Sequence, residues 1–283
     1  MELVQTELEV KLPAKEVLLL PISDLQYGVE GCDFDLFKET IEFGLKNNAV
    51  FLSLGDLTDL ASPSNRRAVA NAGLYDIVMD SLHDAAERAL EDLKVVLAPT
   101  KGRWLGLIQG HHMWTFDDQS TTDTRLADFL GAPFLGDSAM IRLVFREKGQ
   151  RLASDLVIFA AHGVGSGVST AAPIAKLEKL AAHIQADLYL IGHHHKLVAA
   201  PISRLTFVPT RNGGGRLVAK PVYMACTGGY LKGYMQGSRK NNLPGASYVE
   251  KGLMPPVSLG GMSIRLTPTM KDGYALTDIK VTF

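Results

Sequence analysis

Aspartate or histidine follows directly after each of five short apolar runs in the sequence. The runs are VLLLPIS, AVFLSLG, RWLGLIQG, LVIFAA and LYLIG, and the residues after them are Asp24, Asp56, His111, His162 and His193. A run of roughly four to eight apolar residues bounded by turn residues is typical of a strand buried on both faces. Open α/β sheets bind their ligands beyond the carboxyl ends of the strands, so we expect these side chains to meet at one edge.

The residue types at these five positions are those of a metal centre. His193 also begins a row of three histidines that ends at His195, which a buried core rarely needs. A lone histidine at a strand end is more often a structural residue than a ligand, but five strand ends with the same chemistry favour ligands. Carboxylates mixed with imidazoles, without thiolates, suit Mn²⁺, Fe, Zn²⁺ or Ni²⁺ better than a structural zinc cluster. The pattern therefore predicts a metal site.

Segments with helical periodicity separate the apolar runs. They cover roughly residues 34–46, 65–97, 122–130 and 171–185. The alternation of strands and helices predicts an α/β fold with a central sheet, and no linker-like stretch divides it. We therefore expect a single domain over residues 1–283.

Beyond residue 200 the pattern changes to segments of alternating polarity separated by polar turns. These segments are RLTFVP, RLVAKPVYMAC, MSIRLTP and YALTDIKVTF. They predict antiparallel strands, and LVQTELEVKL near the N-terminus alternates in a similar way.

Composition and charge exclude several classes of protein. The chain has 283 residues, 46% hydrophobic and 21% charged, which is ordinary for a globular protein. Its formal net charge of −1 gives no overall attraction to nucleic acid or to an anionic membrane. Cys32 and Cys226 are too few for a disulfide framework and lack zinc-finger spacing. The N-terminal residues lack the apolar segment of a signal peptide, and no run approaches the ~18 apolar residues of a membrane span. We expect a soluble cytoplasmic protein.

The five strand-end blocks, in this order, resemble those of calcineurin-like metallophosphoesterases of the phage and bacterial type. The blocks of that family read D-x-H, G-D-x-x-D, G-N-H-D/E, a single H, and G-H-x-H. Here they stand as DLQ at 24–26, GDLTD at 55–59, GHHM at 110–113, HG at 162–163 and GHHH at 192–195. The blocks cover the first two-thirds of the chain, and residues 200–283 carry no matching motif. The resemblance implies a β-sandwich flanked by helices on both sides.

The resemblance also implies a centre of two divalent metal ions. The implied ligands are Asp24, Gln26, Asp56, His111, His162, His193 and His195. Asp56 would bridge the metals, Asp24 and His195 would hold the first, and the remaining histidines would hold the second. Gln26 stands where the family has histidine, and His111 stands where it has asparagine. Mn²⁺ is the expected metal, with Fe, Zn²⁺, Ni²⁺ and Mg²⁺ as alternatives.

By the same resemblance, His112 is the catalytic histidine and Asp59 is the carboxylate that orients it. Attack on phosphorus leaves an alkoxide that needs a proton, and an imidazolium held in one tautomer can supply it. The implied activity is hydrolysis of a phosphoester, with a phosphodiester in nucleic acid or a nucleotide preferred to a phosphomonoester. The alternative is a non-catalytic module on the same fold, which binds metal or another protein.

Three residues that are not implied metal ligands are candidates for substrate binding. Arg66 and Arg67 lie at the start of a predicted helix, where backbone amides and guanidinium groups could receive a phosphate. A solvated helix start explains them equally well. His194 is the variable position of the last block and could contact substrate or be a turn residue.

The segment 228–261 combines aromatic and cationic residues in a stretch without regular periodicity. The residues concerned are Tyr230, Lys232, Tyr234, Arg239 and Lys240. Such a mixture suits stacked bases and backbone phosphates, so the segment could contact a nucleic acid. An ordinary surface loop is the alternative.

Overall fold

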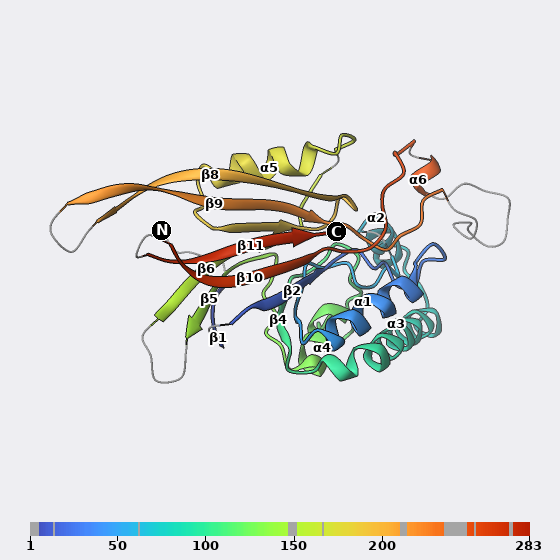
Figure 1. Ribbon diagram of the computed structural model, residues 1–283. Helices are drawn as coiled ribbons and strands as arrows, with labels where there is room; N and C mark the ends of the chain where they lie inside the picture. Colours follow the sequence, from blue (N-terminus) through green and yellow to red (C-terminus); the bar gives the residue numbers. More distant parts are fainter. Residues whose placement is uncertain are drawn as a thin grey trace, which may run out of the picture.

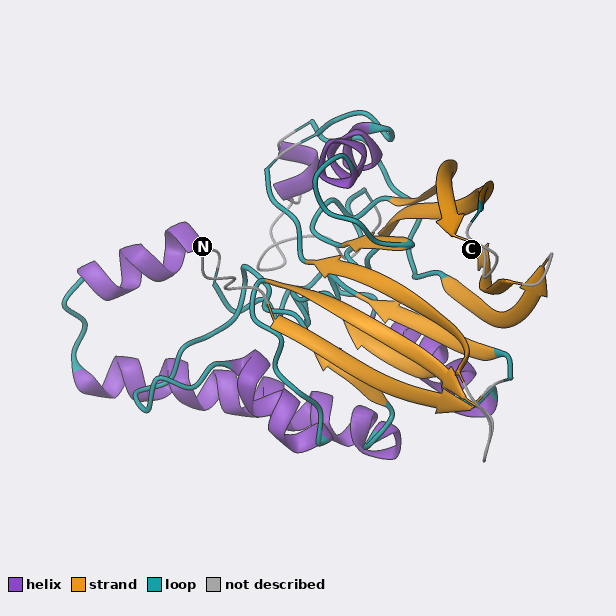
Figure 2. Cartoon of the chain, turned by 90° about the vertical axis from the view of Figure 1, so that its left-hand side faces the viewer, coloured by secondary structure: helices purple, strands orange, loops and turns teal. Residues whose placement is uncertain are grey.

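Two β-sheets pack face to face in the computed structural model, and helices cover their outer faces (Figure 1). The structure describes residues 6–13, 15–61, 63–146, 152–165, 167–209, 214–234, 248–251, 253–271 and 274–283. Figure 2 shows the layers from the side, with helices on both sides of the strands. This arrangement confirms the α/β sandwich with flanking helices that the motif blocks imply.

The larger sheet has six strands in the order β1-β5-β6-β7-β9-β8. Their bounds are Thr6–Pro13 for β1, Ser138–Arg146 for β5, Leu152–Ala161 for β6, Leu188–Ile191 for β7, Gly215–Thr227 for β9 and Leu197–Pro209 for β8. The smaller sheet has five strands in the order β11-β10-β2-β3-β4. Their bounds are Tyr274–Thr282 for β11, Ser263–Lys271 for β10, Val17–Ile22 for β2, Val50–Ser53 for β3 and Trp104–Leu107 for β4.

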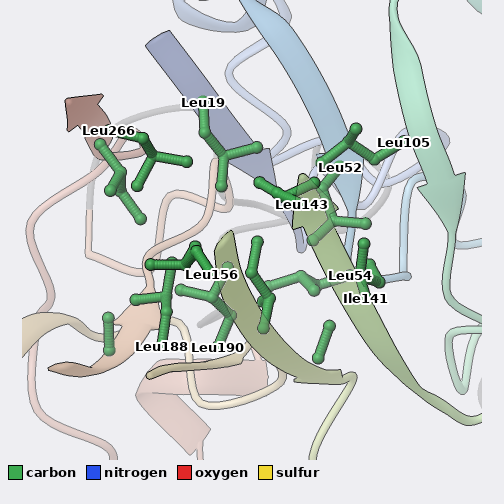
Figure 3. Packing of buried hydrophobic residues seen from close by; sticks show 14 of the residues in the cluster. Leu19, Leu52, Leu54, Leu105, Ile141, Leu143, Leu156, Leu188, Leu190 and Leu266 are labelled. Atoms are coloured by element: carbon green, nitrogen blue, oxygen red, sulfur yellow. The ribbon is translucent and has the colours of Figure 1, made fainter. Parts of the chain in front are cut away.

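The main hydrophobic core lies between the two sheets. Leu19 and Leu52 of the smaller sheet face Leu143 and Leu156 of the larger one, and all four are buried (Figure 3). Fully burying a leucine side chain contributes about 2 kcal/mol. This core therefore holds the two sheets, and with them the strand ends, in a fixed relation.

Helices bury a second and a third core against the outer faces of the sheets. The helices are α1 (Phe34–Lys46), α2 (Pro63–Asn71), α3 (Asp76–Leu97), the 3₁₀ helix η1 (Ala98–Thr100), α4 (Thr122–Leu130), α5 (Ala172–Ala181) and α6 (Tyr248–Lys251). Phe37 of α1, Leu93 of α3 and Leu126 of α4 pack in one cluster with the smaller sheet. Leu177 of α5 packs with Tyr189 of the larger sheet. Within the described residues, no helix is both long enough and apolar enough to cross a bilayer.

The predicted elements and the observed ones agree closely within the motif-bearing part of the chain. The predicted helices 34–46 and 122–130 match α1 and α4. The predicted helix 65–97 is two helices, because Gly73 adopts a left-handed conformation (φ +58°) between α2 and α3. The predicted helix 171–185 is shorter, since α5 ends at Ala181.

The central sheet predicted from the strand–helix alternation is wrong, because the apolar runs divide between two sheets. The strands β2, β3 and β4 pair in parallel in one sheet, whereas β6 and β7 pair in parallel in the other. The four C-terminal segments do form antiparallel pairs, β8 with β9 and β10 with β11. The N-terminal segment instead pairs in parallel with β5, a strand that the sequence reading missed.

Candidate metal centre and catalytic site

Backbone hydrogen bonds bring the loops after β2, β3, β6 and β7 together. The amide of Asp24 donates to Gly55 O at 3.1 Å, and the amide of Gly192 donates to His162 O at 2.9 Å. One bond then joins the two sheets, because the amide of His193 donates to Asp24 Oδ2 at 2.8 Å. The predicted meeting of the strand ends is therefore present, although the strands come from two sheets.

Left-handed backbone is concentrated at these loops. Eight described residues other than glycine have a positive φ, and five of them are predicted metal ligands. These five are Asp24, Gln26, Asp56, His193 and His195, with φ between 52° and 63°. Such a conformation is uncommon for a residue with a Cβ, and strain of this kind clusters at functional sites. The side chains are thus aimed inward at a cost to the local backbone.

Glycine allows the second and third blocks to approach each other backbone to backbone. Gly55 has φ +92°, and a Cβ on it would lie 2.6 Å from Gly110 Cα. A Cβ on Gly110 would overlap the backbone nitrogen and the carboxylate of Asp56. The glycine in each block is therefore required for the Asp56 carboxylate to reach the loop that carries the histidines.

The donor side chains form two groups that share His162. In each group the ligand atoms lie within 4.8 Å of one another. One group is His111, His162 and His193, and the other is Asp24, Asp56 and His162. Asp24 Oδ1 and His162 Nε2 are buried without a hydrogen-bond partner, although His162 Nε2 lies only 3.0 Å from Asp56 Oδ2.

Buried polar atoms without partners are expensive unless a ligand satisfies them. Carboxylates and imidazoles are also the donors that divalent transition metals accept. The residues present therefore fit a divalent metal.

Hydrogen bonds on the far side of two imidazoles set which ring nitrogen faces the centre. His162 Nδ1 lies 2.6 Å from Leu54 O, which leaves Nε2 directed at Asp56. His193 Nε2 lies 3.0 Å from Gly165 O, which leaves its Nδ1 as the available acceptor. Metal-binding histidines commonly donate their other N–H to a carbonyl in this way, which fixes the tautomer and the ring.

Gln26 and His195 lie beside the two carboxylates. Gln26 Nε2 donates to Asp56 Oδ2 at 3.2 Å, and His195 Nε2 lies 3.4 Å from Asp24 Oδ1. The Gln26 amide is thus a hydrogen-bond partner of the carboxylate, and a half-turn of its terminal torsion would present the oxygen instead. Gln26 thus lies where the sequence predicted a ligand, and its neutral amide oxygen is a weaker ligand than an imidazole.

His112 forms an ion pair with Asp59 at the margin of the centre. His112 Nδ1 lies 2.8 Å from Asp59 Oδ1, and its Nε2 lies 3.8 Å from Asp56 Oδ2. Its backbone amide also donates to Asp56 Oδ1 at 2.8 Å. Burial lowers the pKa of His112, but the carboxylates of Asp59 and Asp56 outweigh burial and raise this pKa above its ordinary value. The imidazolium form is therefore available near neutral pH.

The buried charges of the centre leave a proton on His162. Burial lowers the pKa of His162, but the contacts with Asp56 and Asp24 outweigh it and raise the pKa to about 9. Burial raises the pKa of Asp56, yet His162 and His112 hold it below its ordinary range. By contrast, burial and the neighbouring imidazoles lower the pKa of His193 to about 4. His193 is therefore ready to bind a metal at pH 7, whereas His162 must first lose a proton.

Metal binding should consequently release at least one proton at pH 7 and strengthen as the pH rises. His162 is protonated below about pH 9, and a metal must displace that proton, so affinity should increase from pH 6 to about pH 9 and then level off. Calorimetry in two buffers of different ionisation enthalpy measures the protons released. Binding at pH 7 without proton release would contradict the combination of a protonated His162 and its role as a ligand.

Asp123 is a residue of this site that the sequence reading missed. It is buried at the start of α4, and its Oδ2 accepts the amide of Gly110 at 2.9 Å. Burial raises the pKa of Asp123 to about 6. By accepting the amide of Gly110, the side chain of Asp123 positions the loop that carries His111 and His112. An acidic residue in the first turn of a predicted helix was the available signal, but ordinary helix capping produces the same pattern.

The three candidate substrate-binding residues differ in their placement. Arg66 in α2 donates to the carbonyl of Met113, beside the loop that carries His111 and His112. Burial lowers the pKa of Arg66, and the carboxylates of Asp56, Asp123 and Asp59 oppose this shift without cancelling it.

Arg67 is exposed, and no described contact joins it to the centre. The ring of His194 lies 5.3 Å from that of His193. Burial and the charge of Lys176 lower the pKa of His194 to about 4.

The predicted nucleic-acid segment is corrected at Tyr230. Its side chain is 1% exposed and packs edge-on against Phe37, with 5.5 Å between ring centroids, so no base can stack on it. Lys232 forms an ion pair with Asp33 at 3.2 Å. Tyr234 is 46% exposed, and its hydroxyl donates to a backbone carbonyl. Arg239 and Lys240 lie outside the described residues.

No protein-family model matches the sequence, and no curated protein matches it either. Among solved structures, the chain is similar to vacuolar protein sorting 29 from Cryptosporidium parvum at 12% identity and a TM-score of 0.37, over 95% of this chain and 98% of that one. It is similar to a predicted phosphoesterase from Streptococcus pneumoniae TIGR4 at 11% identity and a TM-score of 0.32, over 93% and 88%. The corresponding values for a metallophosphoesterase from Sphaerobacter thermophilus are 13%, 0.31, 94% and 89%.

These TM-scores describe a weak overall similarity, so the fold is assigned from the strand order and the layers. Those layers place each motif block at a strand end beside the others. In its layers and in the order of its motif blocks, the chain resembles the calcineurin-like metallophosphoesterases.

Proposed function

We propose that this protein is a metal-dependent hydrolase of phosphoesters, with a phosphodiester of a nucleotide or nucleic acid as the preferred substrate. One observation carries the proposal. Two groups of metal donors share His162, and the His112–Asp59 ion pair stands directly beside them. A structural metal site has no need of an oriented imidazolium at its margin.

Seven side chains would hold two divalent ions. The proposed ligands are Asp24, Gln26, Asp56, His111, His162, His193 and His195. When bound, such ions would lower the pKa of a water molecule and neutralise charge on the phosphoryl oxygens. Mn²⁺ is the metal we propose, because hard oxygen donors and imidazoles are mixed at the centre.

His112 would donate its proton to the oxygen of the leaving group. Its Nδ1 is held by Asp59 at 2.8 Å, so the Nε2 proton faces the centre. The same carboxylate keeps the imidazole charged until the proton is transferred. The amide bond from His112 to Asp56 fixes the distance between the acid and the donor groups.

The preference for a diester is supported by charge. A diester carries one negative charge and a monoester up to two, so a monoester needs more cationic compensation. The guanidinium of Arg66, beside the loop of His112, already donates to the carbonyl of Met113. The alkoxide leaving group of a natural diester also benefits most from an oriented acid.

Hydrolysis of p-nitrophenyl phosphate and bis-p-nitrophenyl phosphate tests the proposal. With Mn²⁺ added, we expect turnover of both, and faster turnover of the diester. Faster turnover of the monoester would reverse the substrate preference. Metal binding without turnover of either compound would instead favour a non-catalytic metal-binding or protein-interaction module.

A further inference from the structure

A cation stands at the outer edge of the metal centre, on the side of the larger sheet. Lys176 of α5 donates through Nζ to Val164 O, and this nitrogen lies 3.4 Å from His194 Nε2. A Cβ on Gly165 would lie 3.2 Å from the same nitrogen, and Gly165 O is the partner of the His193 ring. Gly165 therefore lies between the ammonium and the proposed ligand His193. We call Lys176 and His194 the rim site.

The ammonium of Lys176 has one N–H that no described acceptor occupies. An ammonium has three N–H donors, and the described acceptors of Lys176, a carbonyl and an imidazole nitrogen, occupy two of them. Among the described residues, no carboxylate forms an ion pair with Lys176. Lys196, the other lysine near His194, donates instead to the carbonyls of Gly167 and Ser169. Lys196 thus holds the loop, and Lys176 is the cation left to receive an anion.

The rim site and the catalytic acid lie on different sides of the centre. His112 contacts Asp56 and Asp59, which follow β3 of the smaller sheet. Lys176 belongs to α5, which covers the larger sheet (Figure 1), and its imidazole partner follows β7. A substrate whose leaving group faces His112 would therefore extend its other end towards Lys176.

We propose that Lys176, supported by His194, binds a second phosphate of the substrate, next to the scissile phosphodiester. This proposal rests on the function proposed above. The substrate is then an oligonucleotide fragment or a nucleotide with more than one phosphate, and a lone diester lacks one of the contacts.

Thymidine dinucleotides with no terminal phosphate, a 5′-phosphate or a 3′-phosphate test the proposal with the Mn²⁺-loaded protein. One terminally phosphorylated form should have a kcat/KM about tenfold higher than the bare dinucleotide, the effect of one charge-assisted hydrogen bond. Lys176→Met should remove this preference, so that the phosphorylated and the bare dinucleotide have equal kcat/KM in the variant. Lys176→Arg should keep it, because the charge remains.

Lys179→Met is the matched control, because Lys179 is an exposed lysine on the same helix. It should keep the full preference. A wild-type protein that is indifferent to the terminal phosphate, or a preference that survives Lys176→Met, would overturn the rim site.

Failure of the proposed function has a different signature. If no dinucleotide is hydrolysed, the hydrolase proposal fails, and the same comparison is made as binding by calorimetry. A terminal phosphate that tightens binding in the wild type but not in Lys176→Met supports the rim site. Equal affinities in the two proteins overturn it.

Discussion

His112→Ala should lower turnover of an alkyl phosphodiester by roughly 10²–10⁴-fold while the metal content stays near that of the wild type. The reason is geometric. His112 contacts the carboxylates of Asp59 and Asp56 but belongs to neither group of metal donors. Its removal therefore takes away a proton donor and leaves the donor atoms of the centre in place. Steady-state kinetics and elemental analysis of the purified variant measure the two quantities.

The effect of this substitution should depend on the leaving group. Nitrophenolate leaves without much protonation, so the loss should be much smaller for bis-p-nitrophenyl phosphate than for an alkyl diester. His183→Ala is a suitable control, because His183 is exposed and belongs to none of the motif blocks. Undiminished turnover in His112→Ala, or loss of its metal, would remove His112 from the role of acid.

The two metal positions should bind with unequal affinity, and the purified protein should retain about one metal ion per chain. Three imidazoles meet at the second position, with ring centroids 4.6–5.3 Å apart. At the first position Gln26 offers a neutral amide, and it already donates to Asp56 at 3.2 Å. An amide oxygen is a weaker ligand than imidazole, so this position should exchange its metal readily and favour Mn²⁺ or Mg²⁺. Activity should rise when excess Mn²⁺ is supplied.

Two reciprocal variants test this inequality. Gln26→His should tighten the first position and reduce the dependence of activity on added Mn²⁺. His111→Asn should weaken the second position and lower the retained metal, since it removes one of the three imidazoles. Titration of the metal-free protein by calorimetry resolves the two events. Two equally tight positions, or tighter binding where Gln26 stands, would show that ligand type does not control the centre.

Local chemistry explains why much of the site could be predicted. The apolar runs before Asp24, Asp56 and His193 form fully or nearly fully buried strands, and burial on both faces leaves a signal in the sequence itself. The helix 34–46 was predictable for a similar reason, because it begins at the cap Asp33 and buries one apolar face. The pairing of His112 with Asp59 followed from the resemblance, and the structure places them 2.8 Å apart.

Tertiary packing decided what these local signals leave open. The residue pattern of a buried strand is the same in either sheet. The division of the apolar runs between two sheets therefore depends on long-range pairing. The burial of Tyr230 against Phe37 likewise depends on contacts almost two hundred residues apart in the chain.

The sequence by itself thus determined the donor types and the strands that carry them, because these depend on residue identity and local burial. Only the folded chain decided which atoms meet: His162 between the two donor groups, Asp123 beneath Gly110, and Lys176 beside His194. Each of these contacts joins separate elements, and no local pattern encodes the distance between them.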